Sequence, residues 1–322
     1  MGSGKYPTTF TIPIIDLYAL RMTTKIGYMR IFSNTTKFAF TLGIFLIPMA
    51  TMASIETGFA TVEGGEIYYE VSGTGEPLIF IHGNAGDRRH WDHQFLPLAI
   101  KYKVVRYDVR GYGNSSLPET GQPYSDTRDL GRLMDHLEIE QAHIIGWSMG
   151  SGIAVDFSIT HPNRVLSLIS VGPWVNGYRS ENATAMSRDM GQVVRQIRER
   201  GIEFGADEWM KAPFFVSTVS RDSSGEEFHE IARDYSWWSF LNSAQIDPIT
   251  PPAIERLNSI ELPTLILTAE NDIPACLEVS ELLETEINGA IRVVMDGTGH
   301  LLHMEKPLEF NAHIVEFIGG LP

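Results

Sequence analysis

Short apolar runs separated by amphipathic stretches are the feature that most restricts the folds open to this chain. The runs lie at residues 77–83, 102–108, 142–147, 165–172, 263–272 and 290–300. Runs that are apolar on both faces are typical of parallel strands covered by helices. Between them, residues 125–139 and 276–287 place apolar side chains on one stripe, and Ser125 is available as an N-cap. The alternation predicts an open α/β sheet with right-handed crossovers.

Two stretches depart from this alternation. Residues 58–73, GFATVEGGEIYYEVSG, alternate apolar and polar side chains around Gly64 and Gly65, which predicts a β-hairpin. Between Pro173 and Pro263 no apolar strand occurs, and helical charged stretches and aromatic clusters take its place. We therefore expect a helical cap inserted over the edge of the sheet where the functional site lies.

The N-terminal segment, residues 1–53, differs in character from the rest. A basic start after Met29 precedes an apolar run at residues 38–50, and small residues follow. This is the order of a secretory signal, so we expect residues 29–53 to direct the protein to the periplasm or the outside of the cell. The run is shorter than the ~20 residues that span a bilayer, so we expect no stable membrane span. The alternatives are a cytoplasmic protein with a disordered or amphipathic leader and a protein anchored to the membrane by an uncleaved leader.

Composition argues against some partners. The formal net charge is −15, whereas proteins that bind nucleic acids carry basic faces, so we expect no nucleic-acid partner. The single cysteine, Cys276, allows neither an intramolecular disulfide nor a cysteine-based metal cluster.

The pentapeptide GWSMG, residues 146–150, follows directly on an apolar run and precedes a small-residue helix start. The G-x-S-x-G pattern is typical of a sharp strand-to-helix turn in which side chains at the flanking positions would clash. Such a turn presents the serine Oγ clear of the sheet and points the N-terminus of the next helix at developing negative charge. The pattern predicts Ser148 as a nucleophile rather than as a turn serine.

A serine nucleophile needs a base within hydrogen-bond reach, because its hydroxyl is protonated at neutral pH. His300 follows the last apolar run, where a loop can bring it over the carboxyl edge of the sheet, and we predict it as the base. We expect a supporting or structural role for His303. The base in turn needs an anion to orient it. Asp272, in the sequence TAEND, is our first choice for that anion, and Glu270 is the runner-up.

An acyl-transfer site also needs hydrogen-bond donors for the oxyanion that forms on the attacked carbonyl group. The loop FIHGNAG, residues 80–86, follows the first apolar run, and we predict the backbone N–H groups of Asn84 and Met149 as the pair. In the nearby sequence YDVRGYGNSS we expect Asp108 and Arg110 to hold a loop together rather than to take part in chemistry.

In chain order, HGNAG, RYDVRGYGNSS, GWSMG, AEND and GTGHLLHMEKP resemble the α/β-hydrolase superfamily with a helical cap, and the chain looks most similar to small carboxylesterases and enol-lactonases. The resemblance implies an α/β fold with a mostly parallel eight-stranded sheet and helices on both faces. The hydrolase core would comprise residues 58–173 and 263–322, and the cap residues 174–262. It also implies Ser148 as nucleophile, His300 as base and Asp272 as its partner, with no cofactor and no metal. One departure is Ser151, where many relatives have glycine, and it bears on helix packing.

Together these residues predict a serine hydrolase that cleaves a small carboxylic ester or lactone through an acyl-enzyme. The same triad could serve C–C bond, thioester or peptide hydrolysis or cofactor-free perhydrolysis, and the motifs do not separate these reactions. A non-catalytic ligand-binding protein on this fold is a further alternative, although such relatives usually lose a triad member and none is lost here. The aromatic residues of the expected cap would either line an apolar acyl pocket or form core: Trp209, Phe214, Phe215, Trp237, Trp238 and Phe240.

Overall fold

The computed structural model describes residues 54–213, 215, 223–242 and 246–321. The expected leader at residues 1–53 and the aromatic residue Phe214 lie outside the described residues. Within the described part, no helix has both the length and the apolar character needed to cross a membrane.

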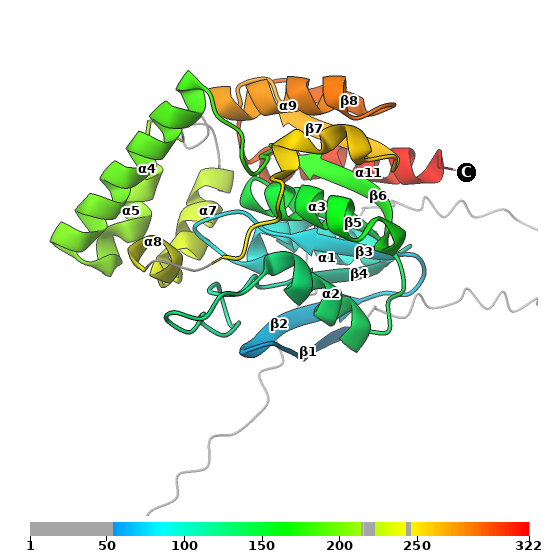
Figure 1. Ribbon diagram of the computed structural model, residues 1–322, viewed down its shortest axis with the longest axis horizontal. Coiled ribbons are helices and arrows are strands. Elements are labelled where there is room, and N and C mark those ends of the chain that lie inside the picture. Colours follow the sequence, from blue (N-terminus) through cyan, green and yellow to red (C-terminus); the bar gives the residue numbers. More distant parts are fainter. Residues whose placement is uncertain (1–53, 214, 216–222, 243–245, 322) are drawn as a thin grey trace, which may run out of the picture. The chain divides into compact units, whose positions relative to one another are not determined.

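Eight strands form one sheet in the order β1-β2-β4-β3-β5-β6-β7-β8 (Figure 1). The strands are β1 (Ile55–Val62), β2 (Gly65–Ser72), β3 (Pro77–Ile81), β4 (Lys103–Tyr107), β5 (Ala142–Trp147), β6 (Val165–Val171), β7 (Thr264–Ala269) and β8 (Ile291–Met295). β2 runs antiparallel to both of its neighbours, β1 and β4, and the other pairs are parallel. The predicted α/β fold with a mostly parallel eight-stranded sheet is confirmed.

The apolar runs and the hairpin pattern have a direct structural cause. Every residue of β5 and of β7 is buried, because these strands have a neighbour on each side and helices over the sheet. β1 and β2 pair from Val62 and Gly65 outward, which leaves a two-residue turn. Gly64 in that turn has a φ of 75°, a left-handed conformation that favours glycine.

Helices α1 (Asp92–Ala99) and α11 (Pro307–Gly319) pack together, as do α2 (Asp126–His136) and α3 (Met149–Thr160). Figure 1 shows the two pairs on opposite faces of the sheet. Ser125 caps α2 as predicted, because its Oγ accepts a hydrogen bond from the Arg128 backbone N–H. The remaining helices of the core are α9 (Pro274–Glu286) and the short α10 (Leu302–Glu305).

The chain between β6 and β7, which we call the inserted segment (residues 174–262), consists of helices and connecting loops where it is described. It contains α4 (Glu181–Arg200), α5 (Gly205–Met210), α7 (Ser223–Arg233) and α8 (Trp238–Leu241). These helices lie together beyond one side of the sheet, at the left of Figure 1. Trp209, Trp237 and Phe240 pack against one another with ring centroids 5.3–5.8 Å apart and give the segment an apolar centre of its own.

The winding of the sheet reverses beside β3. From β3 the chain crosses to β4 on one side, and it later returns to β5 on the other side. Loops that leave the carboxyl ends of β3 and β5 therefore diverge, and a crevice opens at this edge in sheets of this kind. Asn84 follows β3 and Ser148 follows β5, so the order of the strands alone brings these two residues to the same crevice.

Candidate active site

Ser148 occupies a strained turn between β5 and α3, with φ 54° and ψ −115°. A side chain at either flanking glycine would collide with backbone. A Cβ at Gly146 would lie 2.1 Å from the carbonyl oxygen of Gly150, and a Cβ at Gly150 would lie 2.3 Å from that of Ile81. The close packing of this turn explains why glycine is required on both sides of the serine.

The structure brings Ser148, His300 and Asp272 together. His300 Nδ1 lies 2.6 Å from Asp272 Oδ1, and His300 Nε2 lies 3.0 Å from Ser148 Oγ. In the tautomer that carries its proton on Nδ1, the His300 ring donates to Asp272 and Nε2 is left to accept the serine hydroxyl. His300 and Asp272 are 2% and 5% exposed, so this line of hydrogen bonds is shielded from bulk water.

Backbone contacts tie the loop after β7 to the loop after β8. The Asn271 N–H donates to the Thr298 carbonyl at 2.9 Å, and the Gly297 N–H donates to Glu270 Oε2 at 2.7 Å. Glu270, the runner-up for the orienting anion, thus holds the neighbouring loop, and Asp272 is the carboxylate that meets His300.

A hydrogen bond that sequence reasoning missed runs beneath the site. The Trp147 indole Nε1–H donates to the backbone carbonyl oxygen of His300 at 2.8 Å. The Trp147 ring is buried and packs 5.2 Å from the His300 ring and 4.9 Å from the His303 ring, centroid to centroid. His303 also packs against Trp91, which fits the structural role predicted for it.

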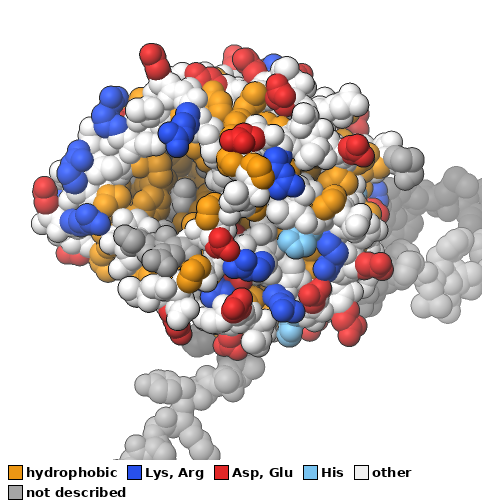
Figure 2. Space-filling model, viewed as in Figure 1, with side chains coloured by type: hydrophobic (Ala, Val, Ile, Leu, Met, Phe, Trp, Pro, Cys, Tyr) orange, Lys and Arg blue, Asp and Glu red, His pale blue; other side chains and the backbone are white. Residues whose placement is uncertain are grey.

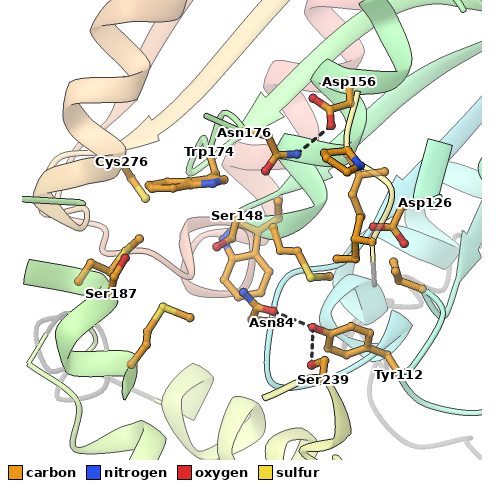
Figure 3. A pocket seen from close by; sticks show the side chains of 18 of the residues that line it. Asn84, Tyr112, Asp126, Ser148, Asp156, Trp174, Asn176, Ser187, Ser239 and Cys276 are labelled. Atoms are coloured by element: carbon orange, nitrogen blue, oxygen red, sulfur yellow. Dashed lines mark hydrogen bonds between the residues drawn. The ribbon is translucent and has the colours of Figure 1, made fainter. Parts of the chain in front are cut away.

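Asn84 and Met149, the predicted oxyanion donors, both line the cavity at Ser148. Met149 is the first residue of α3, and first-turn N–H groups have no acceptor within their own helix. The Asn84 side chain is fixed separately: its Oδ1 accepts from the Tyr112 hydroxyl at 2.8 Å, which accepts from Ser239 Oγ at 3.1 Å. Figure 3 shows this chain of bonds, which links the loop after β3 to the inserted segment.

His82 and Ser151 hold the walls of the site. His82 Nε2 accepts from the Val109 N–H at 3.0 Å and Nδ1 donates to the Gly83 carbonyl at 2.8 Å, while burial lowers the pKa of the ring and keeps it neutral. Ser151 Oγ bonds Ser170 Oγ at 2.6 Å. It also donates to the Trp174 carbonyl and accepts from the Trp174 N–H, each at 3.3 Å. The departure from glycine at residue 151 thus fastens α3 to the start of the inserted segment.

Asp108 and Arg110 hold loops as expected. Asp108 accepts from the backbone N–H groups of Arg88 and Asn114, at 2.9 and 2.8 Å. Arg110 forms a bidentate pair with Asp129, with both bonds at 2.7 Å.

A cavity of about 520 Å³ opens above Ser148. Figure 2 shows a hollow on this face with hydrophobic side chains inside it. Of the aromatic residues expected in the cap, Trp209 and Phe215 line the cavity, whereas Trp237 is buried outside it. The aromatic residues therefore divide between the cavity lining and the buried core.

Two carboxyl groups in the cavity wall were not foreseen from the sequence. Asp126 and Asp156 both line the cavity. Asp156 Oδ2 accepts from Asn176 Nδ2 at 2.9 Å, but Oδ1 of each aspartate is buried without a hydrogen-bond partner among the described residues. Burial is the main cause that raises the pKa of Asp126 to about 7 and that of Asp156 to about 6.

Cys276 lies beside the triad. Potential ligand atoms of Asp272, Cys276 and His300 fall within 4.8 Å of one another. Burial raises the pKa of the Cys276 thiol well above its usual value, and His300 and Asp272 are bonded to each other. The facing atoms of His300 and Asp272 are thus already used by their mutual bond.

Comparisons with known proteins agree with the fold. A family model described as the alpha/beta hydrolase fold matches residues 76–201. The dihydrolipoyllysine-residue acetyltransferase component of an acetoin cleaving system from Cupriavidus necator is 30% identical over 271 residues, 81% of this chain and 69% of that protein. A putative carbamate hydrolase of Azorhizobium caulinodans is 26% identical over 80% of this chain and 96% of its own. The crystal structure of a hydrolase from Pseudomonas aeruginosa superposes with a TM-score of 0.68 at 25% identity, over 82% of this chain and 98% of that one.

Proposed function

Because the chain belongs to the α/β-hydrolase fold family, as its sequence motifs predicted, we propose that it is a serine hydrolase that cleaves small carboxylic esters or lactones through an acyl-enzyme. The observation that carries the proposal is the line of hydrogen bonds from Ser148 through His300 to Asp272 at the wall of a cavity. The similarity to a putative carbamate hydrolase supports attack on an acyl carbon.

In the first half of the reaction, Ser148 Oγ attacks the carbonyl carbon while His300 Nε2 takes its proton. The negative charge that develops on the carbonyl oxygen is held by the N–H groups of Met149 and Asn84. Asp272 stays ionised, holds the imidazole in the required tautomer and stabilises its charged form. His300 then gives its proton to the leaving alcohol, and the acyl group stays on Ser148.

In the second half, a water molecule takes the place of the alcohol. His300 accepts a proton from the water as its oxygen attacks the acyl-enzyme, and the same two N–H groups hold the second oxyanion. Ser148 leaves with the proton from His300, and the carboxylic acid departs.

The inserted segment acts in this proposal as a cap that shapes the acyl pocket. Trp209 and Phe215 come from this segment and face the cavity that Ser148 and His300 also line. An apolar wall of this kind favours a hydrocarbon acyl or alcohol group through burial of its surface.

Replacement of the nucleophile tests the proposal. We expect Ser148→Ala to lower kcat for p-nitrophenyl butyrate by about 10³-fold or more, because no other group forms the acyl-enzyme. Ser158→Ala is the matched control, since Ser158 lies on the same helix and, among the described residues, donates to the Ala154 carbonyl. Thermal unfolding of both variants verifies that they are folded. Undiminished turnover by Ser148→Ala would overturn the assignment of the nucleophile.

A panel of substrates tests the proposal that the protein acts on esters and lactones. Esters, lactones and thioesters of graded chain length are compared by kcat/KM. We expect short and medium esters or lactones to be the best substrates. A clear preference for thioesters would move the assignment to another reaction of the same triad.

A further inference from the structure

We propose that Asp126 and Asp156 form a subsite for a cationic ammonium group, which the substrate carries at a distance from its scissile carbonyl. We call this pair the carboxylate wall. The inference rests on the proposed function, because it names the class of ester or lactone that the same cavity takes.

The carboxylate wall faces the cavity on one side of Ser148. Asp126 is the first residue of α2 and Asp156 lies in the interior of α3, so two different helices bring these carboxyl groups to one place. Figure 3 shows both on the same side of Ser148, with Cys276 on the opposite side. Their electrostatic coupling agrees with this placement, since the charge of Asp156 contributes to the raised pKa of Asp126.

The wall offers acceptor atoms that the protein itself does not use. Asp156 is only 7% exposed, and its Oδ1 has no hydrogen-bond donor among the described residues. Asp126 is partly exposed, and its Oδ1 likewise has no donor among the described residues. These two oxygens have almost no accessible surface, so a ligand reaches them only when the carboxyl groups turn toward the cavity that both residues line. A donor on the ligand then offsets the free-energy cost of an unpaired buried carboxylate oxygen. An ammonium group supplies several N–H donors and the opposite charge.

The charges around the wall favour a cation over an anion. The described lining of the cavity contains three aspartates, Asp126, Asp156 and Asp247, and neither lysine nor arginine. Asp247 is paired with Arg128 at 3.1 Å, so its charge is already compensated.

Charged groups behind the wall belong to other pairs or act from a distance. Asp126 is affected by Asp129, which raises its pKa, and by Arg110, which lowers it. Arg110 is itself bound to Asp129. For Asp156, the Asn176 hydrogen bond and the charge of Arg256 lower the pKa but do not outweigh burial.

Local helix stability does not account for the pair. An acidic residue in the first turn of a helix is favoured by the helix dipole, and this can explain Asp126. It cannot explain Asp156, which lies well inside α3 and keeps one oxygen unpartnered. The common property of the two residues is that they face the same cavity.

Matched esters test the proposal. The substrates are p-nitrophenyl 6-aminohexanoate against p-nitrophenyl heptanoate, and 8-aminooctanoate against nonanoate, so that an ammonium group replaces a methyl group. At pH 8 we expect kcat/KM to favour an ammonium ester by about tenfold, the effect of one charge-assisted contact. Asp126→Asn and Asp156→Asn should each bring that ratio toward one. Asp135→Asn, on the same helix as Asp126 but paired with Arg164 at the surface, should keep the wild-type ratio.

The pH dependence separates a binding role from a structural one. Between pH 5 and pH 8 the carboxyl groups of the wall ionise while the alkylammonium stays charged, so the ratio should rise with pH in the wild type. It should rise less in either asparagine variant. A ratio that does not change with pH in the wild type would contradict the proposal.

Binding without turnover keeps the two proposals distinguishable. Calorimetry at pH 8 measures the dissociation constants of hexylammonium and of 1-hexanol for the Ser148→Ala variant. The same two constants are then measured for the Ser148→Ala/Asp156→Asn variant. We expect tighter binding of hexylammonium, with the preference lost in the double variant. If heptanoate esters are hydrolysed but hexylammonium shows no preference, the carboxylate wall is not a cation subsite and the hydrolase stands. If hexylammonium binds as expected but no ester is turned over, the proposed reaction fails and the subsite stands.

Discussion

The Trp147 indole donates a 2.8 Å hydrogen bond to the backbone carbonyl oxygen of His300. The residue that precedes the proposed nucleophile in the chain therefore positions the loop that carries the proposed base. This bond connects the turn after β5 with the loop after β8, although the two residues are far apart in sequence.

The first prediction concerns this bond. Trp147→Phe keeps an aromatic ring but removes the donor, so we expect the His300 loop to lose its register with Ser148 and kcat to fall about tenfold. Steady-state kinetics with p-nitrophenyl butyrate measure the effect. Trp91→Phe is the matched control: Trp91 is equally buried, but its Nε1 has no partner among the described residues. Equal losses of activity in both variants would show that packing, and not the hydrogen bond, is responsible.

The second prediction concerns the bond from Tyr112 to Asn84. Tyr112→Phe removes the 2.8 Å donation to Asn84 Oδ1 and the connection to Ser239, so the loop that carries the proposed oxyanion donor becomes less well positioned. We expect kcat to fall about threefold to tenfold with a smaller change in KM. Tyr107→Phe, at a buried hydroxyl without a partner in the described part of the chain, should retain activity. An unchanged kcat in Tyr112→Phe would remove Tyr112 from the account.

The third prediction is a pH dependence of stability. The pKa of Asp126 is raised from 3.8 to about 7, so between these values the folded protein keeps a proton that the unfolded chain has lost. The contribution of Asp126 to stability therefore falls as pH rises through this window. Asp126→Asn removes that loss. The difference in Tm between variant and wild type (variant minus wild type) should therefore be about 2 °C or more larger at pH 8 than at pH 4. A difference in Tm between variant and wild type that is the same at both pH values would contradict the raised pKa.

The fourth prediction has the opposite sign. Burial lowers the pKa of His90 from 6.5 to about 3, and both ring nitrogens lack partners among the described residues. The unfolded chain takes up a proton near pH 6.5 that the folded state refuses, so this contribution to stability is lost as pH falls from 6.5 toward 3. His90→Leu should lessen the loss of unfolding free energy between pH 7.5 and pH 4.5 in denaturant titrations. An identical loss in wild type and variant would argue against a neutral, buried His90.

Much of the fold and of the triad could be predicted from the sequence because the signals are local. Strands buried on both faces are apolar throughout, and glycines flank Ser148 because backbone occupies the space where their Cβ atoms would lie. Asp272 and His300 could be placed because each follows a strand at the carboxyl edge of one sheet. Site residues that directly follow strands can therefore be recognised from the sequence alone.

The remaining features depend on which side chains face each other across the fold. The Trp147 bond to His300, the Tyr112 contact with Asn84 and the carboxylate wall each join segments without any shared sequence pattern. Asp126 looks like a helix-start aspartate, and Asp156 like a polar residue within a helix. Only the arrangement of α2 and α3 shows that both face the cavity of Ser148.

Covalent labelling tests the central claim most directly. The wild-type protein is treated with a fluorophosphonate and the modified residue is located by mass spectrometry, alongside Ser148→Ala and a His300→Asn variant verified as folded. We predict a single modified serine at residue 148, no labelling in Ser148→Ala and labelling slowed by about 10³-fold in His300→Asn, because the base activates the hydroxyl. A folded wild-type protein that is not labelled at Ser148, or a His300→Asn variant that is labelled as fast as wild type, would contradict the account.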